Sequence, residues 1–237
     1  FNVGLDTLGF VVTISAFMFG LGAIPAGWAE KRFGGRQLLL IYQFGSSISA
    51  ILVALSSSFE MMVISLGLMG FFCSIYHPAG LTLISHRVDK LTKGMAVHGI
   101  FGSTGSALGP ILATAVAALI SWRASYAVLG TFNGILAIST FFAIPYHRRA
   151  DIPEEEFANH KEKTNKPALI LYFLTNAFLG MAYYGFTTFM PVHFADNTNS
   201  LLPSMSANMK AGLFPTMVFI AGIGGQLIGA KIGDKFH

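Results

Sequence analysis

Residues 8–36 read LGFVVTISAFMFGLGAIPAGWAEKRFGGR, and this stretch decides the fold. Positions 8–29 form an uncharged run of 22 mainly apolar residues, and the positions that follow carry Lys31, Arg32 and Arg36. A helix needs about 20 apolar residues to cross the hydrocarbon core of a bilayer. The stretch therefore predicts a transmembrane helix that ends in a basic turn at the membrane surface.

Six further apolar runs of similar length follow along the chain, at residues 37–57, 61–85, 95–120, 124–145, 167–194 and 208–232. Of all residues, 53% are hydrophobic and 11% are charged, whereas a soluble domain has about 25% charged residues. Such a small number of charges cannot cover the surface of a soluble core. We expect an all-α fold, a polytopic transmembrane helical bundle with seven transmembrane helices in this chain.

The basic residues are distributed unevenly between the two sides of this predicted bundle. If the spans alternate, 13 of the 15 Lys and Arg residues fall on one side, and Arg123 and Lys210 fall on the other. Loops rich in Lys and Arg stay in the cytoplasm, so we expect residue 1 outside and the end of the chain inside. The clusters are short and lie between apolar runs, which argues against nucleic-acid binding and indicates the lipid bilayer as the partner.

The longest hydrophilic stretch, residues 146–166, has an acidic core between basic flanks. We expect a solvated cytoplasmic linker, and a partner-binding role stays open as the alternative. A weak repeat supports this division, because GLGAIPAGWAEKRF at 20–33 and IGGQLIGAKIGDKF at 223–236 both run from a glycine-rich span end into a charged turn. Tandem helix bundles produce repeats of this kind. The expected units are a helix bundle at 1–145, the linker, and the start of a second bundle at 167–237.

Residues 27–36, GWAEKRFGGR, resemble the signature turn G-x-L-A-D-R-x-G-R-R between the second and third helices of the major facilitator superfamily. The matching positions are Gly27, Arg32, Gly34 and Arg36. The acid is displaced, because Lys31 stands where the family has Asp and Glu30 lies one residue earlier. The counterpart turn in the second repeat keeps the acid, as Asp234 followed by Lys235.

Two further segments resemble particular branches of this family. Residues 102–110, GSTGSALGP, are similar to the Gly-Pro motif in the fifth helix of its drug-efflux antiporters, and residues 76–80, YHPAG, resemble fosmidomycin-resistance-type exporters. One departure is that the fourth helix lacks the Arg that many members carry. Counted against the family, the seven spans are helices two to eight of twelve. The chain begins with Phe rather than Met, and we expect a fragment that lacks the first helix and the last four.

The resemblance implies a secondary transporter with two helix bundles that exposes its site to the two sides in turn. Export of a small organic molecule against protons, in a bacterial or archaeal cell membrane, is the expected function. Uptake of a small organic solute is the nearest alternative. A polytopic membrane enzyme is the alternative from another class, but the sequence has no H-E-x-x-H, G-x-S-x-G or P-loop motif. We expect no enzymatic activity and no cofactor; a receptor or assembly factor that does not transport stays open.

The basic turn has a mechanical interpretation as a latch on the cytoplasmic side. A glycine at its start lets two helices approach closely, and Glu30 can pair with a cation or with a helix N-terminus, which carries about half a positive charge. A basic loop that only sets the topology is the alternative. The expected latch residues are Gly27, Glu30, Arg32, Gly34, Arg36, Asp234 and Lys235.

Small residues and prolines mark the expected packing and hinge positions. A small-xxx-small motif permits close helix crossing, and a proline removes one helix hydrogen bond. Static packing without bending is the alternative for these positions. The expected set is Gly102, Gly105, Gly109, Pro110 and Pro78.

His77 is an ionisable residue that lies deep in a predicted span. Ionisable groups inside membranes tend to mark pathways, and the reference pKa of imidazole, about 6.5, allows proton uptake near neutral pH. A neutral, packed histidine is the alternative. The expected substrate or proton pathway contains His77, Tyr76, Asn176, Tyr183 and Tyr184. We expect no metal site, because Cys73 is the single cysteine and the histidines have no carboxylate partner at ligand spacing.

Overall fold

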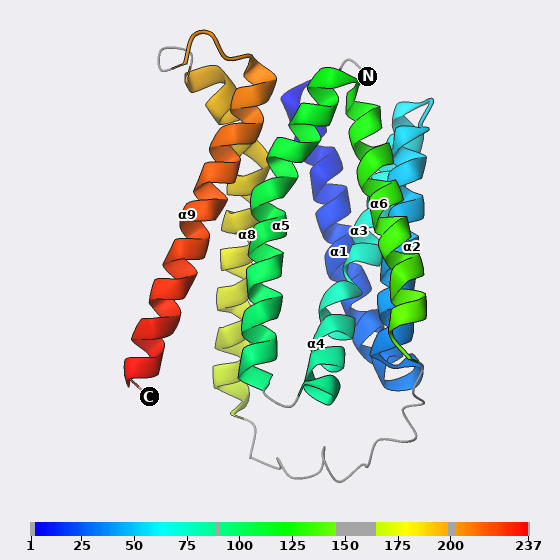
Figure 1. The fold of residues 1–237 in the computed structure, drawn as a ribbon, viewed down its shortest axis with the longest axis vertical. Helices are drawn as coiled ribbons and strands as arrows, with labels where there is room; N and C mark the ends of the chain where they lie inside the picture. Colours follow the sequence, from blue (N-terminus) through cyan, green and yellow to red (C-terminus); the bar gives the residue numbers. More distant parts are fainter. Residues whose placement is uncertain (1–2, 89–90, 146–164, 199–201, 237) are drawn as a thin grey trace.

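Every regular element that the structure describes is an α-helix (Figure 1). The structure is a computed structural model, and it describes residues 3–88, 91–145, 165–198 and 202–236. The helices are α1 (Leu5–Phe33), α2 (Gly35–Ala54), α3 (Phe59–Cys73), α4 (Tyr76–Arg87), α5 (Leu91–Leu119), α6 (Trp122–Ala143), α8 (Lys166–Asn197) and α9 (Ala207–Phe236).

Six stretches of the described residues are long and apolar enough to cross a membrane. They lie on α1, on α2, on α3 with α4, on α5, on α6 and on α8, and they match the first six predicted spans. The seventh predicted span, residues 208–232, lies within α9. These helices confirm the predicted all-α transmembrane bundle. Nearly all of the predicted linker at 146–166 lies outside the described residues.

Successive spans run in opposite directions, so the connections alternate between the two ends of the bundle (Figure 1). The α1–α2 turn, the end of α4, the end of α6 and the start of α8 lie at the lower end of the view. The α2–α3, α5–α6 and α8–α9 connections lie at the upper end. The ends of the helices that lead into the predicted cytoplasmic loops are therefore gathered at one end, and the side of the membrane that this end faces stays a prediction from charge.

Two sets of packed helices make up the bundle. In the first, α1 packs against α3, α2 packs against both α3 and α6, and α4 packs against α1 and α2. In the second, α9 packs against α5 and α8, and α5 also contacts α6. Ala26, Leu38, Ile75 and Ala79 form a small buried core within the first set. Because α5 packs on α9, segments on the two sides of the predicted linker lie in close contact.

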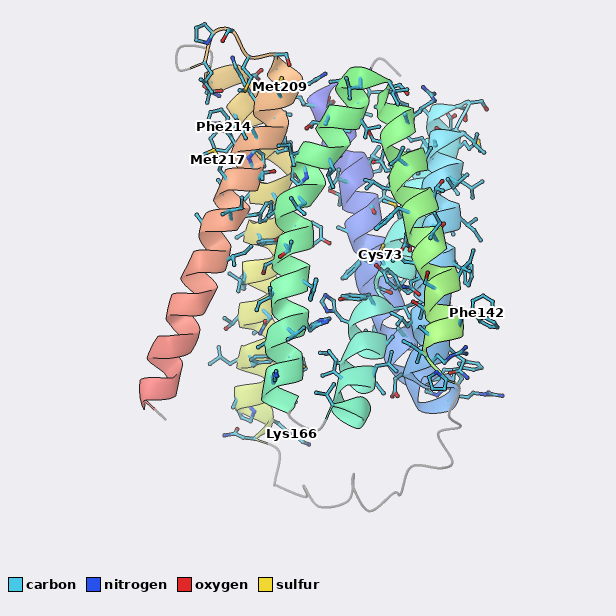
Figure 2. The ribbon with its side chains drawn as sticks, viewed as in Figure 1. Cys73, Phe142, Lys166, Met209, Phe214 and Met217 are labelled. Atoms are coloured by element: carbon cyan, nitrogen blue, oxygen red, sulfur yellow. The ribbon has the colours of Figure 1, made fainter. Side chains whose placement is uncertain are left out.

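The outward surface of the bundle is apolar. Leu171 and Phe178 on α8 are 66% and 68% exposed, and Phe142 on α6 is 80% exposed. Figure 2 shows the Phe142 side chain pointing away from the other helices. An apolar surface of this extent is rare on a soluble monomer. It is the surface expected of helices that lipid or further helices cover.

Side-chain caps start several of these helices. The side chains of Ser58, Ser121 and Asn165 each accept a hydrogen bond from the backbone N–H three residues later, at 3.2, 3.1 and 3.3 Å. The first N–H groups of a helix have no partner within the helix, so each cap satisfies one of them. These residues fix where α3, α6 and α8 begin.

The third predicted span is two helices rather than one. The sequence predicts a single span at residues 61–85, but the helix is interrupted at Ser74 and Ile75, between α3 and α4. Pro78 has no N–H group and cannot donate to the carbonyl of Ser74. The interruption lies one turn before the proline, at the carbonyl that loses its donor, and α4 begins just after it at Tyr76.

Candidate functional site

The basic turn between α1 and α2 is a single residue long. Gly34 separates the two helices and has a φ of 78°, which lies in the left-handed region that favours glycine. Its N–H donates to the carbonyl oxygen of Glu30 at 2.9 Å. A Cβ on the next residue, Gly35, would lie 2.9 Å from the carbonyl oxygen of Ala79. The turn is therefore tight, and it fixes the start of α2 directly against α4.

Arg36 reaches from the start of α2 to the end of α6. Its Nε donates to the carbonyl oxygen of Ile144 at 2.5 Å, and its Nη2 donates to that of Phe141 at 2.7 Å. The last carbonyls of a helix have no partner within the helix and carry partial negative charge, so a cation stabilises them. In the described structure Arg36 therefore joins two helices of the first set, and its role in a latch stays a prediction.

The role of the other expected latch residues stays a prediction. A Cβ on Gly27 would meet no atom within 4 Å, so this position is not at a close helix crossing here. The Arg32 guanidinium lies 5.8 Å from the centre of the neighbouring Phe33 ring. Asp234 and Lys235 lie in the last turn of α9, and their side chains are outside the described part of the chain.

The glycines of α5 meet no close neighbour in the described structure, and their role in packing or bending stays a prediction. A Cβ on Gly102, Gly105 or Gly109 would meet no atom within 4 Å. The close approach between α5 and α9 occurs at Gly212 of α9, where a Cβ would lie 3.2 Å from the carbonyl oxygen of Pro110. Of the three glycines, Gly102 borders a cavity. The helix α5 continues through Pro110 without interruption.

This cavity has a volume of about 630 Å³ and lies between α4, α5, α8 and α9. It therefore lies between the two predicted bundles. Small-molecule sites typically have volumes of about 300–1,000 Å³. The lining residues are Tyr76, His77, His98, Gly99, Gly102, Ser103, Ser106, Tyr183, Phe186, Thr187, Val218, Phe219 and Gly222.

Three aromatic side chains form a cluster on the wall of the cavity. The Tyr76 hydroxyl and His98 Nδ1 lie 3.3 Å apart, within hydrogen-bond distance, and their rings stack with centroids 5.4 Å apart. The His77 ring lies 5.3 Å from Tyr76 and 6.4 Å from His98, centroid to centroid. The cluster joins α4 to α5 and presents two imidazoles and a phenol to one space. Such groups can donate to an anion or exchange a proton.

The expected pathway residues of α8 divide into two groups. Tyr183 lines the cavity with Tyr76 and His77. Asn176 instead donates from Nδ2 to a backbone carbonyl of its own helix, that of Tyr172, at 2.8 Å. Tyr184 is not among the described residues that line the cavity, and it is 44% exposed.

His98 is the site residue that sequence reasoning missed. Its position a few residues inside the predicted membrane boundary suggests ordinary packing. Gly80 lies one helical turn after Tyr76 on α4, and a Cβ there would lie 3.5 Å from His98 Cε1, which is an ordinary van der Waals contact. The glycine is therefore not required by the imidazole, and the local sequence carried no clear signal for this residue.

Comparison with known proteins places the chain in a family. The model of the Major Facilitator Superfamily matches residues 1–237, and the chain belongs to this family. The predicted resemblance is thereby confirmed. Several apolar helices and this membership identify an integral multi-pass membrane protein.

Three relatives illustrate the range of the family. The chain is 24% identical to the cis,cis-muconate transport protein of Acinetobacter baylyi, over 99% of this chain and 59% of the relative. It is 20% identical to the "Probable sulfoacetate transporter SauU" of Cupriavidus necator, over 100% of this chain and 58% of the relative. It is 28% identical to the multidrug efflux pump LfrA of Mycolicibacterium smegmatis, over 54% of this chain and 26% of the relative.

The chain thus spans less than two thirds of the length of these relatives. All three are named as transporters or as a pump.

Proposed function

We propose that this chain is part of a proton-coupled secondary transporter that moves a small organic anion by alternating access. The observation that carries the proposal is the cavity between α4, α5, α8 and α9, with His77, His98 and Tyr76 on its wall. A site between two bundles can be exposed to either side when the bundles rock against each other. In this proposal residues 1–145 and 167–237 belong to the two bundles, and the remaining helices of both lie outside this chain.

The lining of the cavity favours an anion. Its polar groups are two imidazoles, two phenols and the hydroxyls of Ser103, Ser106 and Thr187. The imidazoles and phenols are the groups that can donate hydrogen bonds to an anion, because Ser106 and Thr187 donate to carbonyls of their own helices. Among the described lining residues there is no Asp or Glu to repel a negative charge. Two relatives that are matched over at least 99% of this chain are named for muconate and sulfoacetate, which are organic anions.

Proton coupling in this proposal rests on the histidines. The described spans place no carboxylate in the cavity, and imidazole is the side chain whose unperturbed pKa lies nearest to physiological pH. In this proposal proton binding and anion binding at His77 or His98 are thermodynamically linked, so that movement of one ligand can drive movement of the other. The membrane is proposed to be a bacterial or archaeal cell membrane, with the linker on the cytoplasmic side.

Export is the direction that we infer. Residues 76–80 and 102–110 resemble segments of exporters, and the match to a multidrug efflux pump covers 131 residues. The names of the muconate and sulfoacetate relatives state no direction of transport. Uptake by the same site is the second candidate, and a transport assay separates the two.

The test uses the full-length protein in proteoliposomes that are loaded with radiolabelled cis,cis-muconate or sulfoacetate. A proton gradient with the acidic side outside should accelerate release of the labelled anion, and a protonophore should remove that acceleration. Liposomes without protein supply the background. Movement of a cationic dye such as ethidium, with neither anion moved, would contradict the proposed substrate class. Accumulation of the anions, rather than release, in the same gradient would assign uptake.

A further inference from the structure

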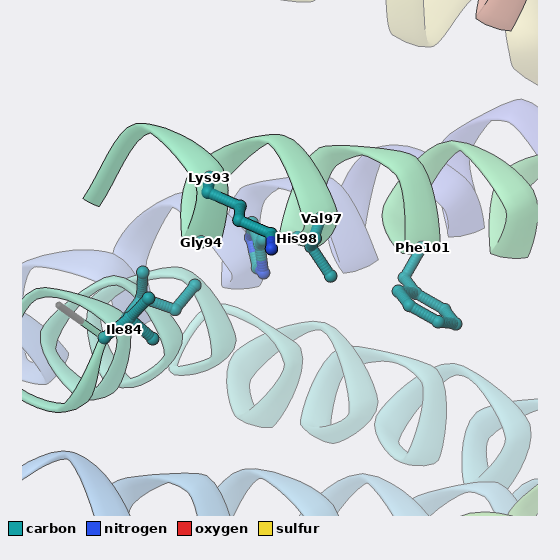
Figure 3. Close-up of a pocket in the computed structure, with 7 residues that line it drawn as sticks. Ile84, Lys93, Gly94, Val97, His98 and Phe101 are labelled. Atoms are coloured by element: carbon teal, nitrogen blue, oxygen red, sulfur yellow. The ribbon is translucent and has the colours of Figure 1, made fainter. Parts of the chain in front are cut away.

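A second cavity of about 680 Å³ lies between the end of α4 and the start of α5, and His98 borders both cavities. Its lining residues are Ile84, Val88, Lys93, Gly94, Val97, His98 and Phe101. Figure 3 shows the side chains of Lys93, Val97, His98 and Phe101 extending from α5 toward the α4 side, where Ile84 lies.

The walls of this cavity are apolar apart from two basic groups. Ile84, Val88, Val97 and Phe101 supply the hydrocarbon surface. Among the described residues that line it, Lys93 is the only lysine or arginine, and no Asp or Glu is present. An ammonium group beside an apolar wall attracts a ligand that combines one negative group with a hydrocarbon or aromatic body. A strongly hydrated inorganic anion gains little from such walls.

The backbone at this cavity is closely packed. A Cβ on Gly94 would lie 2.8 Å from the Ile84 Cγ2 atom and 3.1 Å from Val88 Cγ1. A glycine at this position therefore brings the first turn of α5 against the last turn of α4. Lys93 is the neighbour of this glycine, so the close approach also positions the base of the lysine side chain.

We propose that this cavity is a second binding site, for an organic carboxylate with an apolar body, and that it adjoins the central cavity through His98. Lys93 binds the carboxylate, and the four apolar side chains cover the body of the ligand. The role of this site as a station on the transport route rests on the proposed function, whereas binding itself does not.

Binding can be measured at the cavity without transport. Cysteine is introduced as Val97→Cys in a Cys73→Ser background of the full-length protein, and its alkylation by N-ethylmaleimide is timed. Sodium benzoate is the probe, with benzyl alcohol as its neutral counterpart and inorganic phosphate as an anion without an apolar body. We expect saturating benzoate to slow alkylation about tenfold, with no effect of the other two compounds. Phe142→Cys, on an exposed face of α6, is the control variant, and benzoate should not change its rate of alkylation.

The lysine variants identify the binding group. Loss of one charged partner typically weakens binding about 10- to 100-fold, so Lys93→Gln should require that much more benzoate for the same protection. Lys93→Arg should retain protection, because it keeps the positive charge. Lys166→Gln, which removes a lysine at the start of α8 (Figure 2), should leave the protection unchanged and controls for the general surface charge.

A lipid could supply the same chemistry, and the membrane composition separates the two sources. Protection by phosphatidylglycerol vesicles with none by benzoate would overturn the proposal, as would equal protection by benzyl alcohol. Anion transport without protection at position 97 would leave the proposed function standing and remove this inference. Protection at position 97 without anion transport would support this binding site and contradict the proposed function.

Discussion

Arg36 and Arg123 hold opposite ends of the same antiparallel helix pair. Arg36 at the start of α2 donates to the Phe141 carbonyl at the end of α6, at 2.7 Å. Arg123 at the start of α6 donates to the carbonyl of Ser56, just beyond α2, at 3.0 Å. Each cation lies where helix carbonyls are left without partners within the helix. The pair α2–α6 is therefore fastened at both membrane surfaces by the same chemistry.

Removal of either arginine should destabilise the folded protein. Arg36→Ala and Arg123→Ala should each cost about 1–3 kcal/mol, because carbonyls at the helix ends lose charged donors. Arg36→Lys should recover only part of this loss, since an ammonium cannot reproduce the planar fork. The measurement is the thermal unfolding midpoint in detergent, with Lys166→Ala as a variant of an exposed charge at the same end. Midpoints for both arginine variants equal to that of the Lys166 variant would show that these contacts contribute nothing.

Leucine substitutions should distinguish the glycines that touch another helix from those that do not. A Cβ on Gly130 of α6 would lie 2.9 Å from the Ala50 Cβ and 3.2 Å from the Ser47 carbonyl oxygen. Gly130→Leu should therefore lower stability by about 1–3 kcal/mol through overpacking. Gly109→Leu should be tolerated in folding, because the space around that position is open. Yield of folded protein by size-exclusion chromatography and the unfolding midpoint compare the two, and equal behaviour would contradict the packing described here.

The helices were predictable from sequence because membrane spans follow a simple physical rule. About 20 apolar residues are needed to cross the hydrocarbon core, and each of the six described stretches that can span a membrane has this length. Pro78 predicted the lost hydrogen bond at Ser74, but whether the helix would bend or break there depends on neighbouring helices. Pro110 has the same local chemistry, and α5 continues through it.

The site was only partly predictable, because it depends on which helices meet. His77, Tyr76 and Tyr183 were expected in the pathway and share the central cavity. His98 was missed, since its proximity to Tyr76 is set by the packing of α5 on α4 and not by its own sequence environment. The packing role of the glycines of α5 stays a prediction for the same reason, because a small-residue motif does not say which face meets another helix.

The orientation of the bundle can be tested by thiol labelling from outside intact cells. Ser57→Cys, in the exposed connection between α2 and α3, should react with an impermeant maleimide, because the charge distribution places it outside. Lys166→Cys, at the opposite end of the bundle, should react only after the cells are opened. Both variants carry Cys73→Ser to remove the native thiol. Reaction of Lys166→Cys in intact cells would reverse the predicted orientation.

The role of His77 in coupling can be tested by the dependence of transport on pH. A charge in the membrane interior costs several kcal/mol on most estimates, so His77 is expected to be neutral at rest. His77→Gln keeps hydrogen-bonding capacity but cannot bind a proton, so it should still bind substrate and lose the pH dependence of transport. His77→Phe keeps an aromatic ring without polar atoms, and it should lose transport.

His98→Gln provides the matched comparison on the other side of Tyr76. If His77 alone carries the proton, His98→Gln should change the apparent affinity for the anion while the pH profile keeps its shape. If the two imidazoles share one proton through their common cavity, each Gln variant should flatten the profile, and the double variant should add little to either. Transport rates are measured against external pH in proteoliposomes, with folding checked by size-exclusion chromatography. Wild-type rates and pH profiles in all three single variants would show that the cluster of Tyr76, His77 and His98 only packs the helices. Proton coupling would then depend on other residues of the protein.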